Sequence, residues 1–296
     1  MRYLHSILNT VFFYITTATP FIFAAPEQPP VDFFAARAFG GSYSSYYDTV
    51  SGDFNGDGKV DALMSTYSGV VAAFGNGNGT FAEPVSIYTA SGGFTFLSTV
   101  SGDFNGDGRS DAVMVRQSQS SFPDIAVYLG NSDRTFSAPI FANAGTNPLY
   151  IKTLDYDRDG KLDVLASVSG APGNALILYR GLGDGNFAVG PTLSAARQGL
   201  PIIGDFNNDM FPDIWFYDNS VHRIALNTGN GQFGPFTATD VSPDVDVQGF
   251  GDFNNDGRLD VVSMDGGSFN PWVTIWIGTG IYTYAEGQDY QFQSSN

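Results

Sequence analysis

Apolar residues along this chain gather in short runs that polar, glycine-rich turns separate. An apolar run such as FLSTVSG precedes each copy of an acidic motif, and a run rich in β-branched or aromatic residues, such as DAVMV, follows it. A third run such as IAVYL comes next, then a turn, then a fourth segment that begins at Phe81, Phe136, Phe187 or Phe233. Such runs predict strands, joined by connections too tight for crossover helices. The pattern therefore predicts four-stranded antiparallel sheets.

The acidic motif recurs five times in register. Its copies occupy 53–61, 103–111, 155–163, 205–213 and 252–260, and successive copies start 47 to 52 residues apart. A period of this length is typical of repeat architectures with one supersecondary unit per copy. A four-stranded sheet cannot bury both faces alone, whereas sheets stacked radially around an axis leave only short edges. We therefore predict an all-β fold, a single β-propeller domain of five four-stranded blades over 33–296.

The sequence leaves open which terminus completes the last blade. The segment FFAARAFGGSYSS from Phe33 and the C-terminal YTYAEGQDYQF both resemble the fourth strand of the first unit, TFAEPVSIYTASGG. Either segment could supply the outer strand of the fifth blade.

Each motif offers oxygen atoms at alternate positions of one tight loop. Positions 1, 3, 5 and 9 carry Asp or Asn in every copy, and position 7 can contribute its backbone carbonyl. Position 6 is glycine in four of five copies, which permits a positive φ where the chain doubles back. Such ligands surround a hard cation of Ca²⁺ size. We predict about five Ca²⁺ sites, one per repeat, held by Asp53, Asn55, Asp57, Lys59, Asp61, Asp103, Asn105, Asp107, Arg109, Asp111, Asp155, Asp157, Asp159, Lys161, Asp163, Asp205, Asn207, Asp209, Phe211, Asp213, Asp252, Asn254, Asp256, Arg258 and Asp260.

Other interpretations of the motif explain less. A lone copy could be a turn held by Asx hydrogen bonds, but five copies in register argue against that alternative. An EF-hand would need Glu at position 12, where Met64, Met114, Ala166, Phe216 and Ser263 stand. Mg²⁺ prefers strict octahedral geometry with several waters, and softer metals prefer His or Cys.

The fourth copy departs from the pattern, because Met210 stands where the other copies have glycine. The loop must either hold a side chain in the left-handed region, at a cost of about 1 kcal/mol or more, or follow another path with poorer ligand geometry. We therefore predict that the fourth Ca²⁺ site is the weakest of the five.

The net charge of the chain limits the partners that we expect it to bind, and the N-terminal segment indicates where the protein is located. A formal net charge of −17 without a basic cluster argues against nucleic acid as a partner. Residues 1–25 combine basic residues with an apolar stretch that ends in small ones, which predicts a secretory signal peptide, and 26–32 is a proline-rich linker. A membrane anchor is the alternative, but threonines and a proline interrupt a stretch shorter than the roughly 20 residues of a spanning helix. We predict a protein that is secreted, extracellular, periplasmic or at the cell surface, with no membrane insertion after cleavage.

The repeats resemble the FG-GAP/VCBS type, a calcium-loop propeller repeat found in integrin α subunits and in many secreted proteins, some of them lectins. The resemblance is strongest at DYDRDGKLDVLASVSGAP, where Gly170, Ala171 and Pro172 reproduce the GAP element. It implies that the calcium loop joins the first and second strands of each blade on one face of the ring, with ligand-binding loops on the opposite face. Family propellers commonly have seven blades, whereas this chain has five motifs.

Two classes of function are compatible with the sequence. The first is a binding module for a glycan or an extracellular protein, with candidate loops at 116–124, 142–150 and 264–272. Trp272, Phe122 and Tyr150 could stack on a sugar there, although aromatic residues also fill the space between blades. The alternative is an extracellular hydrolase or lyase acting on a polysaccharide or a lipid. We predict no catalytic residues, because no G-x-S-x-G motif occurs and His222 is the only histidine after the predicted signal peptide.

Overall fold

A computed structural model provides the structure of the chain. It describes residues 46–66, 69–89, 94–118, 124–142, 147–169, 175–194, 201–218, 221–265 and 272–291. The predicted signal peptide, the predicted linker and the segment from Phe33 lie outside these residues, as do Phe122 and the GAP element. Within the described ranges, no helix is long and apolar enough to cross a lipid bilayer.

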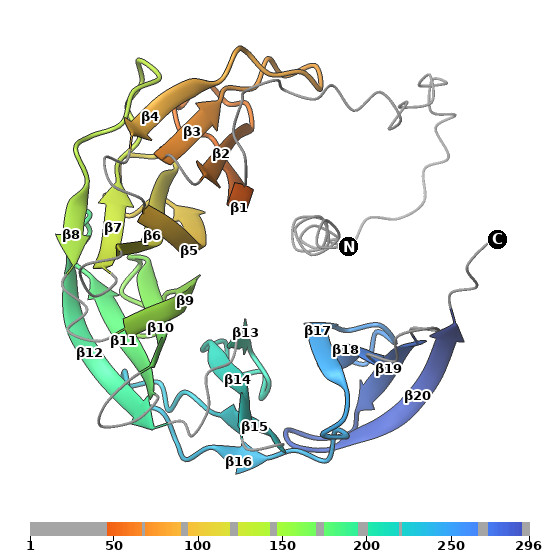
Figure 1. Cartoon of the computed structure of the whole chain (residues 1–296). Helices are drawn as coiled ribbons and strands as arrows, with labels where there is room; N and C mark the ends of the chain where they lie inside the picture. The colour runs from red at the N-terminus through yellow and green to blue at the C-terminus, as the bar shows by residue number, and fades with distance from the viewer. Residues whose placement is uncertain are drawn as a thin grey trace, which may run out of the picture. The chain divides into compact units, whose positions relative to one another are not determined.

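The described residues form five four-stranded antiparallel sheets, labelled in Figure 1 and here called blades 1 to 5. Blade 1 contains β1 (Tyr46–Gly52), β2 (Asp61–Thr66), β3 (Gly69–Ala73) and β4 (Val85–Thr89). Blade 2 contains β5 (Phe94–Gly102), β6 (Asp111–Ser118), β7 (Asp124–Tyr128) and β8 (Ile140–Ala142). Blade 3 contains β9 (Asn147–Leu154), β10 (Asp163–Ser169), β11 (Ala175–Gly181) and β12 (Phe187–Ser194).

Blade 4 contains β13 (Ile202–Gly204), β14 (Asp213–Asp218), β15 (Val221–Ala225) and β16 (Thr237–Ala238). Blade 5 contains β17 (Asp246–Gly251), β18 (Asp260–Asp265), β19 (Trp272–Gly278) and β20 (Tyr284–Gln291). The strands of every blade pair in chain order, so the predicted fold class is confirmed: an all-β propeller with five blades. The C-terminal strand β20 forms the outer strand of blade 5, which answers the question that the two similar terminal segments raised.

The outer strands begin later than the sequence predicts in three blades. Phe81, Phe136 and Phe233 each make an isolated bridge, and the regular strands β4, β8 and β16 start only after a following proline. Proline has no N–H for the strand ladder, so pairing resumes beyond Pro84, Pro139 and Pro235. In β12, which does begin at Phe187, Pro191 instead lies in the segment where the register shifts.

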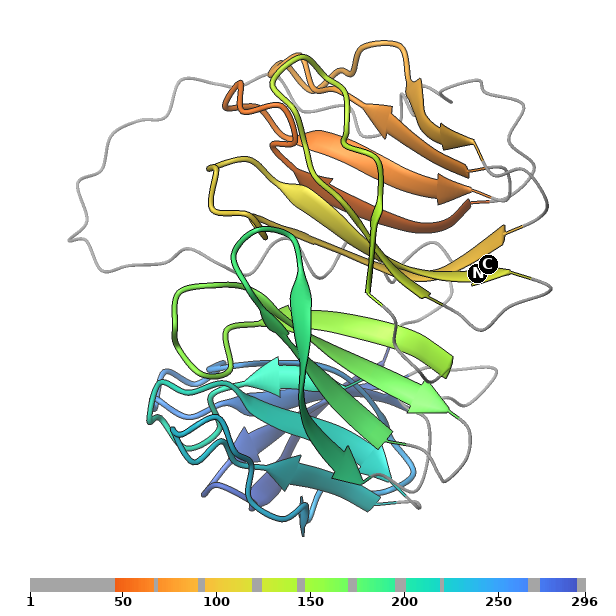
Figure 2. The same cartoon turned by 90° about the vertical axis from the view of Figure 1, so that its left-hand side faces the viewer.

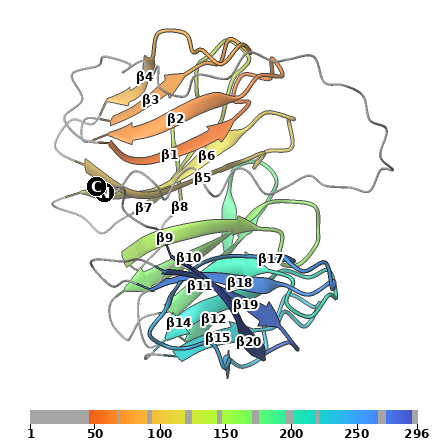
Figure 3. The ribbon, with the colours of Figure 1, turned by 90° about the vertical axis from the view of Figure 1, so that its right-hand side faces the viewer.

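Strands of the middle blades bury both faces, because each sheet lies between two neighbours. In β6, Ala112 and Met114 pack in a cluster shared with blade 1, while Val113 and Val115 pack in a cluster shared with blade 3. Successive residues of a strand point to opposite faces. One strand therefore contributes to two cores, and Figure 3 shows blades 1 and 2 lying against each other.

At three of the four junctions, consecutive blades meet at a glycine that precedes the acidic motif; the third motif has Leu154 there instead. A Cβ added to Gly52 would lie 2.6 Å from the Cβ of Ser110 in blade 2, so only glycine leaves room for that neighbour. Asp53 and Ser110 also exchange hydrogen bonds across this junction. At these three junctions the residue that meets the glycine stands at position 8 of the next motif. The pairs are Gly52 with Ser110, Gly102 with Leu162, and Gly204 with Leu259.

An aromatic residue at position 2 of the motif reinforces these junctions. It packs in a tilted or edge-on orientation against the first residue of the outer-strand segment in the next blade. The pairs are Phe54 with Phe136 at 5.7 Å between centroids, Phe104 with Phe187 at 5.8 Å, and Tyr156 with Phe233 at 6.4 Å. The corresponding positions in the first and fifth motifs, which among the described residues have no such partner in a neighbouring blade, are more exposed. Phe253, at position 2 of the fifth motif, is 42% exposed, and Val60, at position 8 of the first motif, is 65% exposed. Each junction is therefore directional.

Candidate metal centres

Each acidic motif forms the loop between the first and second strands of its blade, as the resemblance implies. Position 9 is the first residue of the second strand in every blade. The loops consequently lie at the same end of the sheets, on the left-hand side of Figure 2.

The backbone adopts left-handed φ angles at two positions of every motif. Position 6 has φ between 70° and 84°, and its residues are Gly58, Gly108, Gly160, Met210 and Gly257. Position 4 has φ between 58° and 75°, and its residues are Gly56, Gly106, Arg158, Asn208 and Asn255. The sequence indicated the first requirement through its glycines. The left-handed backbone at position 4 was not predicted from the sequence, because only two copies carry glycine there.

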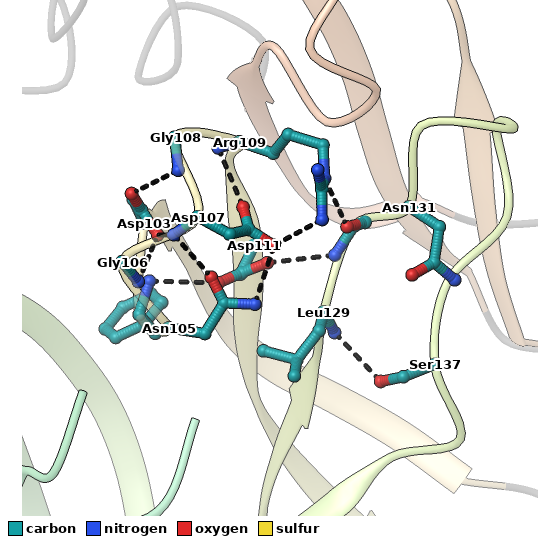
Figure 4. A network of polar contacts seen from close by, with 12 residues as sticks. Asp103, Asn105, Gly106, Asp107, Gly108, Arg109, Asp111, Leu129, Asn131 and Ser137 are labelled. Carbon is teal, nitrogen blue, oxygen red and sulfur yellow. Dashed lines mark hydrogen bonds and ion pairs between the residues drawn. The ribbon is translucent and has the colours of Figure 1, made fainter. Parts of the chain in front are cut away.

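Carboxylates at positions 1 and 5 accept hydrogen bonds from the backbone of their own loop, as Figure 4 shows for blade 2. Asp103 Oδ1 accepts from the Gly106 N–H at 2.7 Å, and Asp103 Oδ2 from the Gly108 N–H at 2.8 Å. Asp107 Oδ1 accepts from the Arg109 N–H at 2.9 Å. An ionised carboxylate offers about four acceptor sites, so lone pairs remain for a cation.

The carboxylate at position 9 has different surroundings. Asp111 is fully buried, and its two oxygens accept N–H groups of Phe104 and Gly130, both at 2.9 Å. Equivalent pairs of bonds occur at Asp61, Asp163, Asp213 and Asp260. Position 9 therefore ties the motif loop to the end of the third strand. Its contribution as a metal ligand, through the remaining lone pairs, stays a prediction.

Burial changes the ionisation of these aspartates. Loss of solvent raises the pKa of Asp111, Asp163 and Asp213 to about 6, although two backbone N–H donors favour the charged form of each. Neighbouring motif carboxylates raise these pKa values further: those at positions 1 and 5 for Asp111 and Asp213, and those at positions 1 and 3 for Asp163. Burial raises the pKa of Asp61 as well. Keeping these buried carboxylates ionised therefore costs free energy, and a nearby cation would offset that cost.

Blade 3 gathers the densest group of carboxylates. Oxygens of Asp155, Asp157 and Asp159 lie within 4.8 Å of one another, because position 3 is here Asp rather than Asn. Arg180 in β11 offsets this charge: its Nε donates to Asp157 at 2.9 Å and its Nη2 to Asp159 at 2.8 Å. The sequence analysis missed Arg180. The signal was available, since the other repeats carry apolar residues at this column: Phe74, Leu129, Leu226 and Ile277.

Basic residues at position 7 accompany four of the loops. Lys59, Arg109, Lys161 and Arg258 each pair with the position-5 carboxylate of their own motif. These groups are partly exposed, and exposed pairs contribute about 1 kcal/mol or less. In blade 4 the residue is Phe211, which the guanidinium of Arg158 covers at 4.9 Å from the ring centroid.

The donor set fits a hard cation. Positions 1, 3 and 5 present carboxylate and amide oxygens, and position 7 has a backbone carbonyl to offer. The three carboxylates of blade 3 could hold a metal ion as they stand. Oxygen ligands of this kind suit Ca²⁺, so the residues present fit the predicted ion.

The predicted ligand-contacting aromatics are partly accessible. Trp272 is 38% exposed and Tyr150 is 40% exposed. His222, in contrast, is buried in β15, with its Nε2 atom 3.2 Å from the carbonyl oxygen of Val245. Burial lowers the pKa of this imidazole, which agrees with a structural role.

A family model described as an FG-GAP-like repeat matches the chain at residues 53–114, 103–166 and 205–263. These three matches together span more than half of the chain. A search of curated proteins by sequence gives no match.

Solved structures supply more distant similarities. An Agrocybe aegerita lectin specific for non-reducing terminal N-acetylglucosamine aligns with a TM-score of 0.60 and 20% identity, over 84% of this chain and 67% of that one. The rhamnogalacturonan lyase YesX aligns with a TM-score of 0.48 and 15% identity, over 81% and 48%. The Tc holotoxin pore of Photorhabdus luminescens gives 0.47 and 16%, over 85% and 12%. The first similarity shows the fold alone, and the other two are too distant to bear on function.

The buried aspartates should make the stability of the metal-free protein fall as pH rises. Their pKa of about 6 exceeds the ordinary value of 3.8. The folded state therefore binds protons more tightly, and this stabilisation is full below about pH 3.8 and lost as pH rises through about 6. Denaturant unfolding in chelator across this window measures the slope.

Asp111→Asn should flatten that slope, whereas Asp133→Asn, at an exposed carboxylate outside the motifs, should not. Excess calcium should reverse the trend, because metal binding requires deprotonated ligands. A metal-free stability that climbs steadily between about pH 4 and 6 would contradict this assignment of the buried carboxylates.

Met210 confirms the first of the two alternatives for the fourth loop, with φ at 70° and an N–H that bonds Asp205 as glycine does in the other loops. Met210→Gly should therefore raise the free energy of unfolding by about 1 kcal/mol and tighten calcium binding at this loop. Gly257→Met is the matched reverse variant, since φ is 84° and a Cβ would meet nothing within 4 Å. It should lose a similar amount. Equal stabilities for both variants and the parent, measured by denaturant unfolding, would refute the strain.

Proposed function

The chain belongs to the FG-GAP-like repeat family, and from this premise we propose that it is a secreted, calcium-stabilised binding module that recognises a glycan or an extracellular protein. The observation that carries the proposal is the fivefold recurrence of the same oxygen-lined loop at the same end of every blade. A rigid scaffold of this kind leaves the connections at the other end of the blades free to contact a ligand.

Calcium, when bound, would supply positive charge at the centre of each carboxylate group. The chain's own residues hold the loop ready for it: backbone N–H groups orient the carboxylates at positions 1 and 5, and left-handed residues turn the backbone around them. Two carboxylates about 4 Å apart repel by about 1 kcal/mol in water and by more near a protein surface. The ion reverses the sign of this interaction.

Export is proposed from residues 1–25, which have the pattern of a signal peptide. The chain has no cysteine, so disulfides cannot restrain it outside the cell. Five metal-bound loops would replace them, each closing a connection within its own blade.

A glycan is the ligand that we favour. The lectin with the same fold recognises a terminal sugar, and exposed aromatic rings such as Trp272 offer a flat surface of the kind that a sugar ring needs. The predicted alternative, a hydrolase or lyase that uses the propeller as a scaffold, has no specific observation in its favour.

Chelation should lower the melting temperature by many degrees. If each site has the roughly 10⁻⁴ M affinity of extracellular modules, millimolar calcium contributes about 1.4 kcal/mol per site. Five independent sites would contribute about 7 kcal/mol, comparable to the net stability of a typical domain. Thermal melting of the mature chain in calcium and in chelator tests this, with magnesium as the control ion. A melting curve that chelator leaves unchanged would exclude calcium from most of the loops.

Binding to an array of glycans, carried out with and without calcium, tests the function itself. We expect binding to defined sugars that chelator abolishes through loss of the fold. An array without signal, together with capture of a defined cell-surface protein, would favour the adhesion type of module over the lectin type.

A further inference from the structure

A cavity of about 320 Å³ lies on blade 5. Its walls come from β19, β20 and the segment that leads from β16 to β17. The strand β18 runs away from its motif loop, and Trp272 begins β19 after the following connection. Trp272, which lines the cavity, is therefore at the end of the blade opposite the acidic motif. Its volume is at the small end of the range for ligand pockets.

One wall is a single accessible aromatic surface. Trp272 and Trp276 are four residues apart in β19, so both side chains lie on the same face of the sheet. Trp276 is 7% exposed, and its indole N–H donates inward to Ser263 Oγ at 2.9 Å. Trp272 keeps 38% of its surface exposed. The cavity thus offers one flat ring to a ligand rather than an aromatic cage.

The neighbouring strand β20 contributes hydrogen-bond acceptors to the same side of the sheet. Glu286 and Asp289 reach the cavity from β20, where a register shift between Thr274 and Trp276 brings both to one side. The Thr274 hydroxyl donates to Asp289 Oδ1 at 2.7 Å, which leaves Oδ2 for another donor. Both acidic residues are exposed, and no Lys, Arg or His is among the described residues that line the cavity.

Blade 4 fixes the remaining wall. The Tyr217 hydroxyl donates to the carbonyl oxygen of Pro243 at 2.9 Å, and the His222 Nε2 atom lies 3.2 Å from the carbonyl oxygen of Val245. These contacts hold the segment that carries the lining residues Ser242 and Val245. A wall that is already ordered reduces the entropic cost of binding.

We infer that this cavity binds a neutral pyranose sugar, with Trp272 beneath the ring and the carboxylates of Glu286 and Asp289 accepting its hydroxyl hydrogens. The inference deepens the proposed glycan-binding function and rests on it. A sugar ring has one flat apolar face for the indole, and its hydroxyls supply the donors that carboxylates require.

Charge distinguishes the possible occupants. Two carboxylates without a neighbouring cation repel uronic acids and sulfated sugars. A cationic ligand would gain most from desolvated carboxylates and several aromatic faces. Here the acidic groups are exposed, and among the described residues that line the cavity only Trp272 presents an accessible ring. A neutral sugar matches both features.

The experiment uses the mature chain in calcium on immobilised neutral sugars, glucose, galactose and N-acetylglucosamine, with heparin and polygalacturonate as anionic probes. Trp272→Ala should reduce binding of the neutral sugar about tenfold or more, the loss expected of a central aromatic contact. Glu286→Gln should reduce it severalfold. Tyr290→Ala is the matched control, because Tyr290 is 48% exposed on the neighbouring position of β20, outside the cavity lining. It should bind as the parent does.

The outcomes separate this site from the wider proposal. Binding of a neutral sugar that Trp272→Ala and Glu286→Gln leave unchanged, in variants with unaltered melting curves, would overturn this site and leave the lectin function standing. Absence of binding to every glycan by the parent chain would overturn the lectin function itself. Preference for the anionic probes, or competition by tetramethylammonium with strong salt dependence, would replace the neutral sugar by a charged ligand.

Discussion

The buried carboxylate at the start of each second strand is the interaction on which the rest of this structure depends. It accepts one N–H from the motif loop and one from the end of the third strand, so a single side chain connects three parts of the blade. The loop that it anchors carries the candidate metal ligands on one side and the aromatic residue of the junction at position 2 on the other. The candidate metal site and the packing between blades therefore both depend on this carboxylate.

Just over half of the acidic residues of the chain lie in the motif loops. Of the 30 acidic residues, 16 lie at motif positions, against a net charge of −17. The excess charge is thus concentrated where a divalent ion would neutralise it, rather than spread over the surface. Close carboxylates repel one another, so this distribution favours the proposed cation in each loop.

Sequence alone predicted the features that repeat. Five copies in register fixed the number of blades, the antiparallel pairing and the connection in which each acidic loop lies. Features carried by a single residue were harder to foresee. Proline delayed three outer strands. Arg180 stands out in the sequence as the one charged residue of an apolar column, but its role follows only from its contact with Asp157. Gly52 has no side chain and so leaves room for Ser110 of the next blade. Asp53, which follows this glycine, is 57 residues from Ser110 in the sequence, so no local pattern predicts the contact. Of the candidate site, the sequence supplied the ligand types and their spacing but not the burial that sets position 9 apart.

The directional junction has a consequence for how such chains vary in length. Because the position-2 ring lies on one side of a blade and the position-8 side chain on the other, the contacts between consecutive blades are head-to-tail, and at three of the four junctions a glycine makes room for the position-8 side chain. A head-to-tail contact can form again when duplication of a coding segment adds a whole repeat, or when loss of such a segment removes one. The two sides of a blade are therefore different surfaces, and the accessible Val60 of blade 1 and Phe253 of blade 5 belong to opposite kinds of side.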